Sequence, residues 1–124
     1  ISVSGSCDGY KSSAGMVHRS VHLSQDGELK IEDHWPEAAR DLARTVYIVP
    51  GEWVVEQNTD QMAVISSPEG VKVKIDVTCG RIVGTGETSW YPAGPMRPKL
   101  GTFLEISPCD GVLTLLVETV RTSP

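Results

Sequence analysis

The residue types best suited to chemistry lie near the amino end, where histidines and an aspartate occupy a predicted β-hairpin. The turn is Asp26-Gly27, which supplies the positive φ that tight turns need. Pairing through this turn brings His18 close to Asp33. We therefore expect these two side chains to be neighbours, either as a charged pair or as two ligands of one site.

His18 itself has three interpretations. It can act as a general acid or base, it can bind a metal, or it can be an ordinary half-exposed strand histidine. A metal pair with His22 is excluded, because four residues of strand separate the two rings by roughly 13 Å. Tyr10 follows Asp8-Gly9 and is a second candidate proton donor or base, although most tyrosines beside glycine are packing or turn residues.

Two adjacent aromatic residues, Trp90 and Tyr91, are candidates for stacking on sugar rings. They lie in the proline-rich stretch 87–99, which predicts a long ordered loop of the kind that often carries function or docks a partner. The alternative is that both rings cap the fold or contact a neighbouring domain.

Length and charge limit the functional classes. A chain of 124 residues predicts a single domain, residues 1–124, and no apolar run approaches the ~20 residues of a membrane span. The net charge of −5 and the lack of a basic cluster argue against nucleic-acid binding. The chain begins with Ile1, so we expect either a mature product or a domain cut from a longer protein.

The cysteines Cys7, Cys79 and Cys109 are odd in number and widely spaced. No CxxC motif or Cys/His cluster is present, so a zinc finger has no support. One disulfide with a free thiol and three reduced cysteines both remain open, and so does the redox compartment.

Short alternating runs separated by turn signals at ~8–12-residue spacing predict an all-β fold, an antiparallel β-sandwich of about nine short strands in two sheets. Residues 1–16 are rich in Gly and Ser and predict a loop or a short edge strand, and residues 37–42 are long enough for one helical turn. The expected strands are 17–23, 28–33, 44–49, 53–56, 62–66, 71–77, 81–85, 100–106 and 112–118.

Several short motifs also occur in an order that resembles a known family. They are Asp8-Gly9-Tyr10, Gly-Met-Val-His-Arg at 15–19, Leu-Lys-Ile-Glu-Asp at 29–33, Val-Tyr-Ile-Val-Pro at 46–50 and Glu-Thr-Ser-Trp-Tyr-Pro at 87–92. Together they resemble the β domain of heparinase II/III-like polysaccharide lyases. Each motif is short, and their order along nearly the whole chain is the better evidence.

The resemblance implies an antiparallel β-sandwich that follows an N-terminal α/α toroid, so this chain would be a C-terminal domain that is inactive alone. The implied partners are that missing toroid domain and an acidic polysaccharide, in a bacterial periplasmic or secreted protein. The implied reaction is β-elimination. A base removes the C5 proton of a uronic acid, an acid protonates the leaving glycosidic oxygen, and neighbouring groups neutralise the carboxylate.

The resemblance also implies roles for particular residues. His18 matches the strand histidine and is a catalytic candidate together with Tyr10. Arg19, Trp90 and Tyr91 are candidates for substrate binding.

Some family members hold a structural zinc through a strand His, a strand-end Asp and a later His. Here His18 and Asp33 match the first two positions, but Tyr47 occupies the third, and Cys7 stands where the family often has His before Asp-Gly-Tyr. With two ligands of three, we expect no zinc and no other cofactor. The alternative function is a non-catalytic carbohydrate-binding or structural β-sandwich module.

Overall fold

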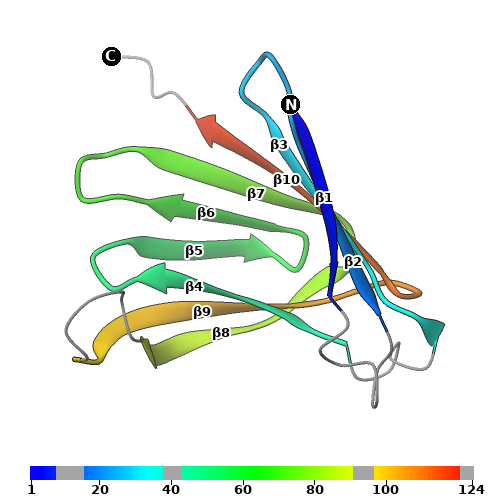
Figure 1. The fold of residues 1–124 in the computed structure, drawn as a ribbon. Helices are drawn as coiled ribbons and strands as arrows, with labels where there is room; N and C mark the ends of the chain where they lie inside the picture. Colours follow the sequence, from blue (N-terminus) through cyan, green and yellow to red (C-terminus); the bar gives the residue numbers. More distant parts are fainter. Residues whose placement is uncertain (8–15, 38–42, 91–96, 121–124) are drawn as a thin grey trace.

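The computed structural model describes residues 1–7, 16–37, 43–90 and 97–120, and ten β-strands account for most of them (Figure 1). The strands are β1 (Ser2–Cys7), β2 (Val17–Leu23), β3 (Leu29–His34), β4 (Thr45–Pro50), β5 (Val54–Thr59), β6 (Met62–Ser66), β7 (Lys72–Cys79), β8 (Arg81–Trp90), β9 (Lys99–Ser107) and β10 (Val112–Val120). The described ranges contain no helix long and apolar enough to cross a membrane.

The strands form two antiparallel sheets. The large sheet has the order β1-β2-β3-β10-β7-β6-β5, and the small sheet has the order β4-β9-β8. In Figure 1 the small sheet runs along the lower part of the molecule, while β1, β2 and β3 form the arm on the right. The predicted fold class, an antiparallel β-sandwich, is confirmed.

Two segments differ from the sequence-based expectation. For residues 1–16 the sequence predicted a loop or a short edge strand, and the structure has an edge strand there, because β1 pairs along its length with β2. The predicted loop 87–99 is too long, since β8 continues to Trp90 and β9 begins at Lys99, with the two strands paired over these residues. The stretch 91–96 lies outside the described residues, as does 38–42, which covers most of the predicted helical turn.

A glycine marks the point where the chain passes from the large sheet to the small one. Gly80, between β7 and β8, has a φ of 113°. A Cβ atom placed there would lie 2.5 Å from the carbonyl oxygen of Ser107 and 2.8 Å from Cδ1 of Leu113. Only glycine suits both this backbone conformation and this close approach.

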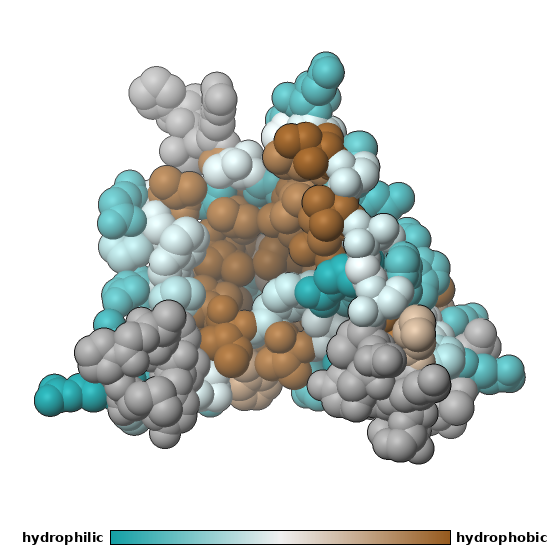
Figure 2. Space-filling view, in the orientation of Figure 1, coloured by the Kyte–Doolittle hydropathy of each residue, from teal (hydrophilic) through white to brown (hydrophobic). Residues whose placement is uncertain are grey.

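The hydrophobic core lies between the small sheet and one half of the large sheet. Its buried members come from β4, β8 and β9 on one side and from β6, β7 and β10 on the other: Val49, Ala63, Ile65, Ile75, Val77, Ile82, Leu104, Ile106, Leu113 and Leu115. Neither β1 nor β2 contributes a residue to this core, and Val3 is 65% exposed. Figure 2 shows the result, a hollow on this face in which apolar side chains gather.

Candidate functional site

The register of the β2–β3 hairpin decides which side chains meet. Arg19 lies opposite Asp33, and His18 lies opposite His34. Successive side chains on a strand point to opposite faces, so His18 and Asp33 lie on opposite faces of the large sheet. The expectation that His18 and Asp33 are neighbours is therefore wrong.

The physical reason is the length of the turn. The amide of Ser24 donates to the carbonyl of Glu28 at 2.9 Å, and this closes a three-residue loop whose last member, Gly27, has a φ of 86°. A glycine in the left-handed region is typical of three-residue hairpin loops. Pairing His18 with Asp33 would require a different loop length, and a shift of one residue exchanges the two faces of a strand.

On the inner face, which looks toward the small sheet, Asp33 forms a two-pronged ion pair with Arg19. Arg19 Nε donates to Oδ1 at 2.6 Å and Nη2 donates to Oδ2 at 2.7 Å, while the hydroxyl of Thr45 lies 3.5 Å from Oδ2. The Asp33 side chain is 2% exposed and that of Arg19 is 48% exposed. The hydrogen bonds to Asp33 raise the pKa of Arg19, so this charge is permanent at any pH the fold tolerates.

Tyr47 lies beside this pair. The Arg19 guanidinium carbon is 6.0 Å from the centre of the Tyr47 ring, at the outer limit of a cation–π contact. Burial raises the pKa of the phenol, and Arg19 opposes the shift. The phenol oxygen is buried without a hydrogen-bond partner in the described structure, which is unfavourable for a polar atom.

These positions do not fit a zinc ion. Both carboxylate oxygens of Asp33 are bonded to Arg19, whose positive charge also repels a cation. His18 points away from Asp33, so the two cannot ligate one ion. In the ranges that the structure describes, no group of three His, Cys, Asp or Glu side chains is arranged to hold a metal.

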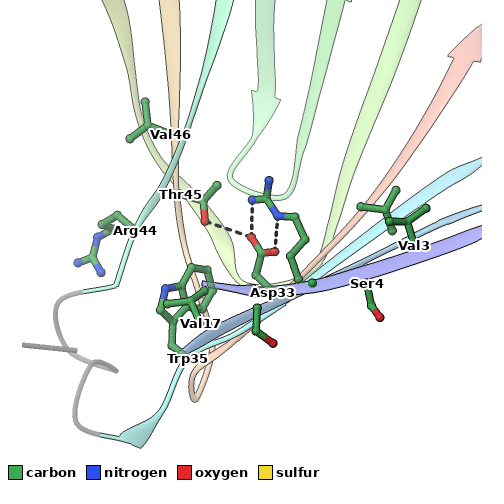
Figure 3. A pocket seen from close by; sticks show the side chains of 12 residues that line it. Val3, Ser4, Val17, Asp33, Trp35, Arg44, Thr45 and Val46 are labelled. Carbon is green, nitrogen blue, oxygen red and sulfur yellow. Dashed lines mark hydrogen bonds and ion pairs between the residues drawn. The ribbon is translucent and has the colours of Figure 1, made fainter. Parts of the chain in front are cut away.

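The Arg19–Asp33 pair lies on the wall of a groove with a volume of about 580 Å³. Half of the other lining residues have apolar side chains, namely Val3, Val17, Val21, Trp35 and Val46. In Figure 3, Trp35 and Val17 lie close to Asp33, whereas the guanidinium of Arg44 points away from it. The groove opens where the small sheet no longer covers the large one.

The outer face of the same strands carries all three histidines. Each imidazole hydrogen-bonds to one neighbour: His18 Nδ1 to Ser6 Oγ at 2.8 Å, His22 Nδ1 to Ser2 Oγ at 2.5 Å, and His34 Nε2 to Glu32 Oε1 at 2.7 Å. His18 and His34 are direct cross-strand neighbours, and Cα atoms in such pairs are about 4.5–5.5 Å apart. The outer face thus presents two adjacent imidazoles between a hydroxyl and a carboxylate.

Glu32 is the carboxylate that bonds His34 on this face. The hydrogen bond from His34 lowers the pKa of Glu32, and weaker contributions come from Lys30 and from the Thr114 hydroxyl, which lies 3.5 Å from Oε2. Partial burial acts in the opposite direction. A carboxylate fixed in this way orients the His34 ring, and oriented imidazoles are suited to proton transfer.

The remaining predicted site residues can be placed only in part. Tyr10 and Tyr91 lie outside the described residues, and Trp90 is described only as the last backbone position of β8. Arg19 points into the groove and not toward His18. Sequence reasoning missed the His34–Glu32 pair, although alternation along 28–34 places both residues on one face.

Comparison with protein-family models, with curated proteins and with solved structures gives no match for this chain.

Proposed function

We propose that this chain is the β domain of a heparinase II/III-like polysaccharide lyase, which acts with an α-helical domain on uronate-containing polysaccharides by β-elimination. The ordered sequence motifs support the family. The observation that carries the site is the outer row of Ser6, His18, His34 and Glu32. In this proposal the outer face of β1–β3 is the surface that the domain contributes to the active site.

His18 is the proton-transfer group in this arrangement. When Nδ1 donates its proton to Ser6 Oγ, Nε2 holds the lone pair that can accept the C5 proton of a uronate. His34 is fixed by Glu32 through Nε2, which leaves Nδ1 as a hydrogen-bond donor for the uronate carboxylate when the ring is protonated.

The outer face also explains why activity would need a second domain. The side chains of His34 and Glu32 are 47% and 33% exposed, so water surrounds the imidazoles. Electrostatic stabilisation of a developing enolate is strong only where water is excluded. A covering domain supplies that exclusion, and the isolated chain is expected to be inactive.

The decisive experiment compares the isolated domain with a longer protein that carries the α-helical domain of this proposal. Both are incubated with a panel of uronate polymers, and unsaturated uronate is followed by its ultraviolet absorbance. The proposal expects product from the longer protein only. If the longer protein eliminates no uronate polymer, the lyase assignment is wrong.

A matched pair of variants tests His18 within an active longer protein. His18→Gln is expected to lower kcat by about 10²–10⁴-fold, the usual contribution of a general base. His22→Gln is the control, because His22 lies on the same strand and face and also bonds a serine. Equal losses in the two variants would show that His18 has no special role.

The groove favours a second candidate, a non-catalytic carbohydrate-binding module. Trp35 offers an aromatic ring beside polar groups, which is a common arrangement for holding a sugar. Titration of the isolated domain with uronate oligosaccharides separates the candidates. Binding that is lost in Trp35→Ala or Trp90→Ala would favour the module, and no binding would count against it.

A further inference from the structure

Two cysteines that are far apart in sequence meet at one end of the large sheet. Cys79 is the last residue of β7 and pairs with Thr114 of β10. Cys109 precedes β10 and forms an isolated bridge with Val112. Val112 and Thr114 are two residues apart on one strand, so both cysteine side chains are directed to the same face of the sheet.

The turn that carries Cys109 is rigid. Cys109 and Val112 exchange two backbone hydrogen bonds, of 2.8 and 3.0 Å. The residues between them, Asp110 and Gly111, have φ values of 50° and 77°, as in a two-residue type I′ turn. Cys109 is therefore held at a fixed position beside the end of β7.

The Cys79 thiol points at this turn. Its Sγ lies 3.5 Å from the carbonyl oxygen of Val112 and 3.9 Å from that of Cys109. Both cysteines are free thiols in the structure, Cys79 half-buried and Cys109 exposed.

We propose that Cys79 and Cys109 form a disulfide in an oxidising environment, which ties the Cys109–Val112 turn to the end of β7. Neighbouring positions on one face of a sheet fall in the separation range that a disulfide spans. The bond would join the end of β7 to the turn that leads into β10, and so would close a loop of about 30 residues that contains β8 and β9.

The reaction needs an external disulfide, and glutathione disulfide serves as the oxidant. The Cys109 thiolate attacks one sulfur of glutathione disulfide and releases the first glutathione thiolate. The Cys79 thiolate then attacks the Cys109 sulfur of the mixed disulfide and releases the second. The protein thiols lose two electrons and two protons, and two reduced glutathione molecules form.

The exposures fit this order of attack. Cys109 is accessible to a small reagent, whereas Cys79 is partly covered. Burial and the nearby Cys109 raise the pKa of the Cys79 thiol, so the second step is expected to be slower at neutral pH than at higher pH. The proposal does not depend on the proposed function, since it uses neither His18 nor the groove.

The experiment uses the purified chain with Cys7→Ser, because Cys7 is the third thiol and its pairing must be excluded. The protein is equilibrated with excess glutathione disulfide and then digested with trypsin without reduction. The expected product is a disulfide-linked pair of the peptides 75–81 and 100–121, with a loss of two thiols per chain. Retention of both thiols, or glutathione that stays on Cys109, would overturn the proposal.

Thermal unfolding gives the second readout on the same sample. The oxidised form is expected to melt roughly 5–10 °C above the form treated with a reductant, as for other disulfides that close loops of this length. The matched controls are Cys79→Ser and Cys109→Ser in the same background, which should show no such difference. An oxidised form that melts lower than the reduced form would contradict a bond that fits the native geometry.

Discussion

The two faces of the β1–β2–β3 arm each carry a cross-strand pair of ionisable side chains, but the two pairs differ in their partners and in their burial. On the inner face, Arg19 and Asp33 form a two-pronged ion pair whose carboxylate is almost fully buried. On the outer face, His18 and His34 make one hydrogen bond each and remain accessible. The register of the hairpin therefore places a buried carboxylate with its cation on one face and accessible imidazoles on the other.

The largest expected effect concerns the inner pair. Asp33→Ala leaves the Arg19 charge in the groove without a partner and is expected to lower the free energy of unfolding by about 3 kcal/mol, the lower end for a broken buried ion pair because Arg19 reaches water. His18→Gln on the outer face is expected to cost less than about 0.5 kcal/mol. Urea unfolding of both variants is the measurement, and equal losses would remove the contrast between the faces.

The geometry of the ion pair predicts a smaller effect for Arg19→Lys. A lysine keeps the charge but replaces two parallel hydrogen bonds with one point contact, so we expect a loss of about 1–2 kcal/mol. The midpoint of urea unfolding measures it. A lysine variant as stable as the wild type would show that charge alone, without the two-pronged geometry, holds Asp33.

Tyr47→Phe is expected to act in the opposite direction. The phenol oxygen is buried without a partner in the part of the chain described, so its removal should leave stability unchanged or raise it by up to about 1 kcal/mol. Thermal unfolding at constant pH is the test. A loss of more than about 1 kcal/mol would mean that the hydroxyl has a bonding partner in solution.

The smallest effect lies on the outer face and depends on pH. Because His34 lowers the pKa of Glu32 below its ordinary 4.5, the pair stabilises the fold above that pH, and the contribution disappears as the pH falls through the lowered value. The Glu32 side chain is one-third exposed and the pair lies at the surface, so we expect only a few tenths of a kcal/mol. Urea unfolding is measured from about pH 6 to about pH 3. Over this range the free energy of unfolding should fall slightly less for Glu32→Gln than for the wild type. A larger decrease in the free energy of unfolding at low pH in the variant would contradict this prediction.

Much of the fold was predictable because alternation and turn residues are local signals. The strand Met62–Ser66 has the predicted bounds, and the Asp26-Gly27 turn lies where it was expected. The run 87–90 was assigned to a loop because of the prolines that follow it, although Thr and Trp favour strands. β1 is poor in strand-forming residues and owes its structure to pairing with β2.

The candidate site was less predictable than the fold. A hairpin loop of three residues and one of two or four residues leave similar sequence patterns, but they place opposite sets of side chains on each face. This difference separated His18 from Asp33 and placed Arg19 beside the carboxylate instead. Only the observed backbone pairing at Ser24 and Glu28 fixes that choice.

Gly80 limits which positions of the domain can accept substitutions. Its missing side chain lets the strand ends of both layers approach at one point, and any larger residue would have to separate the carbonyl of Ser107 from the Leu113 side chain. A substitution there therefore disturbs the point at which the two layers meet. Diversification of this domain is expected to avoid that crossover and to be better tolerated at Gly5 in β1, where a Cβ atom would meet open space and φ lies outside the left-handed region.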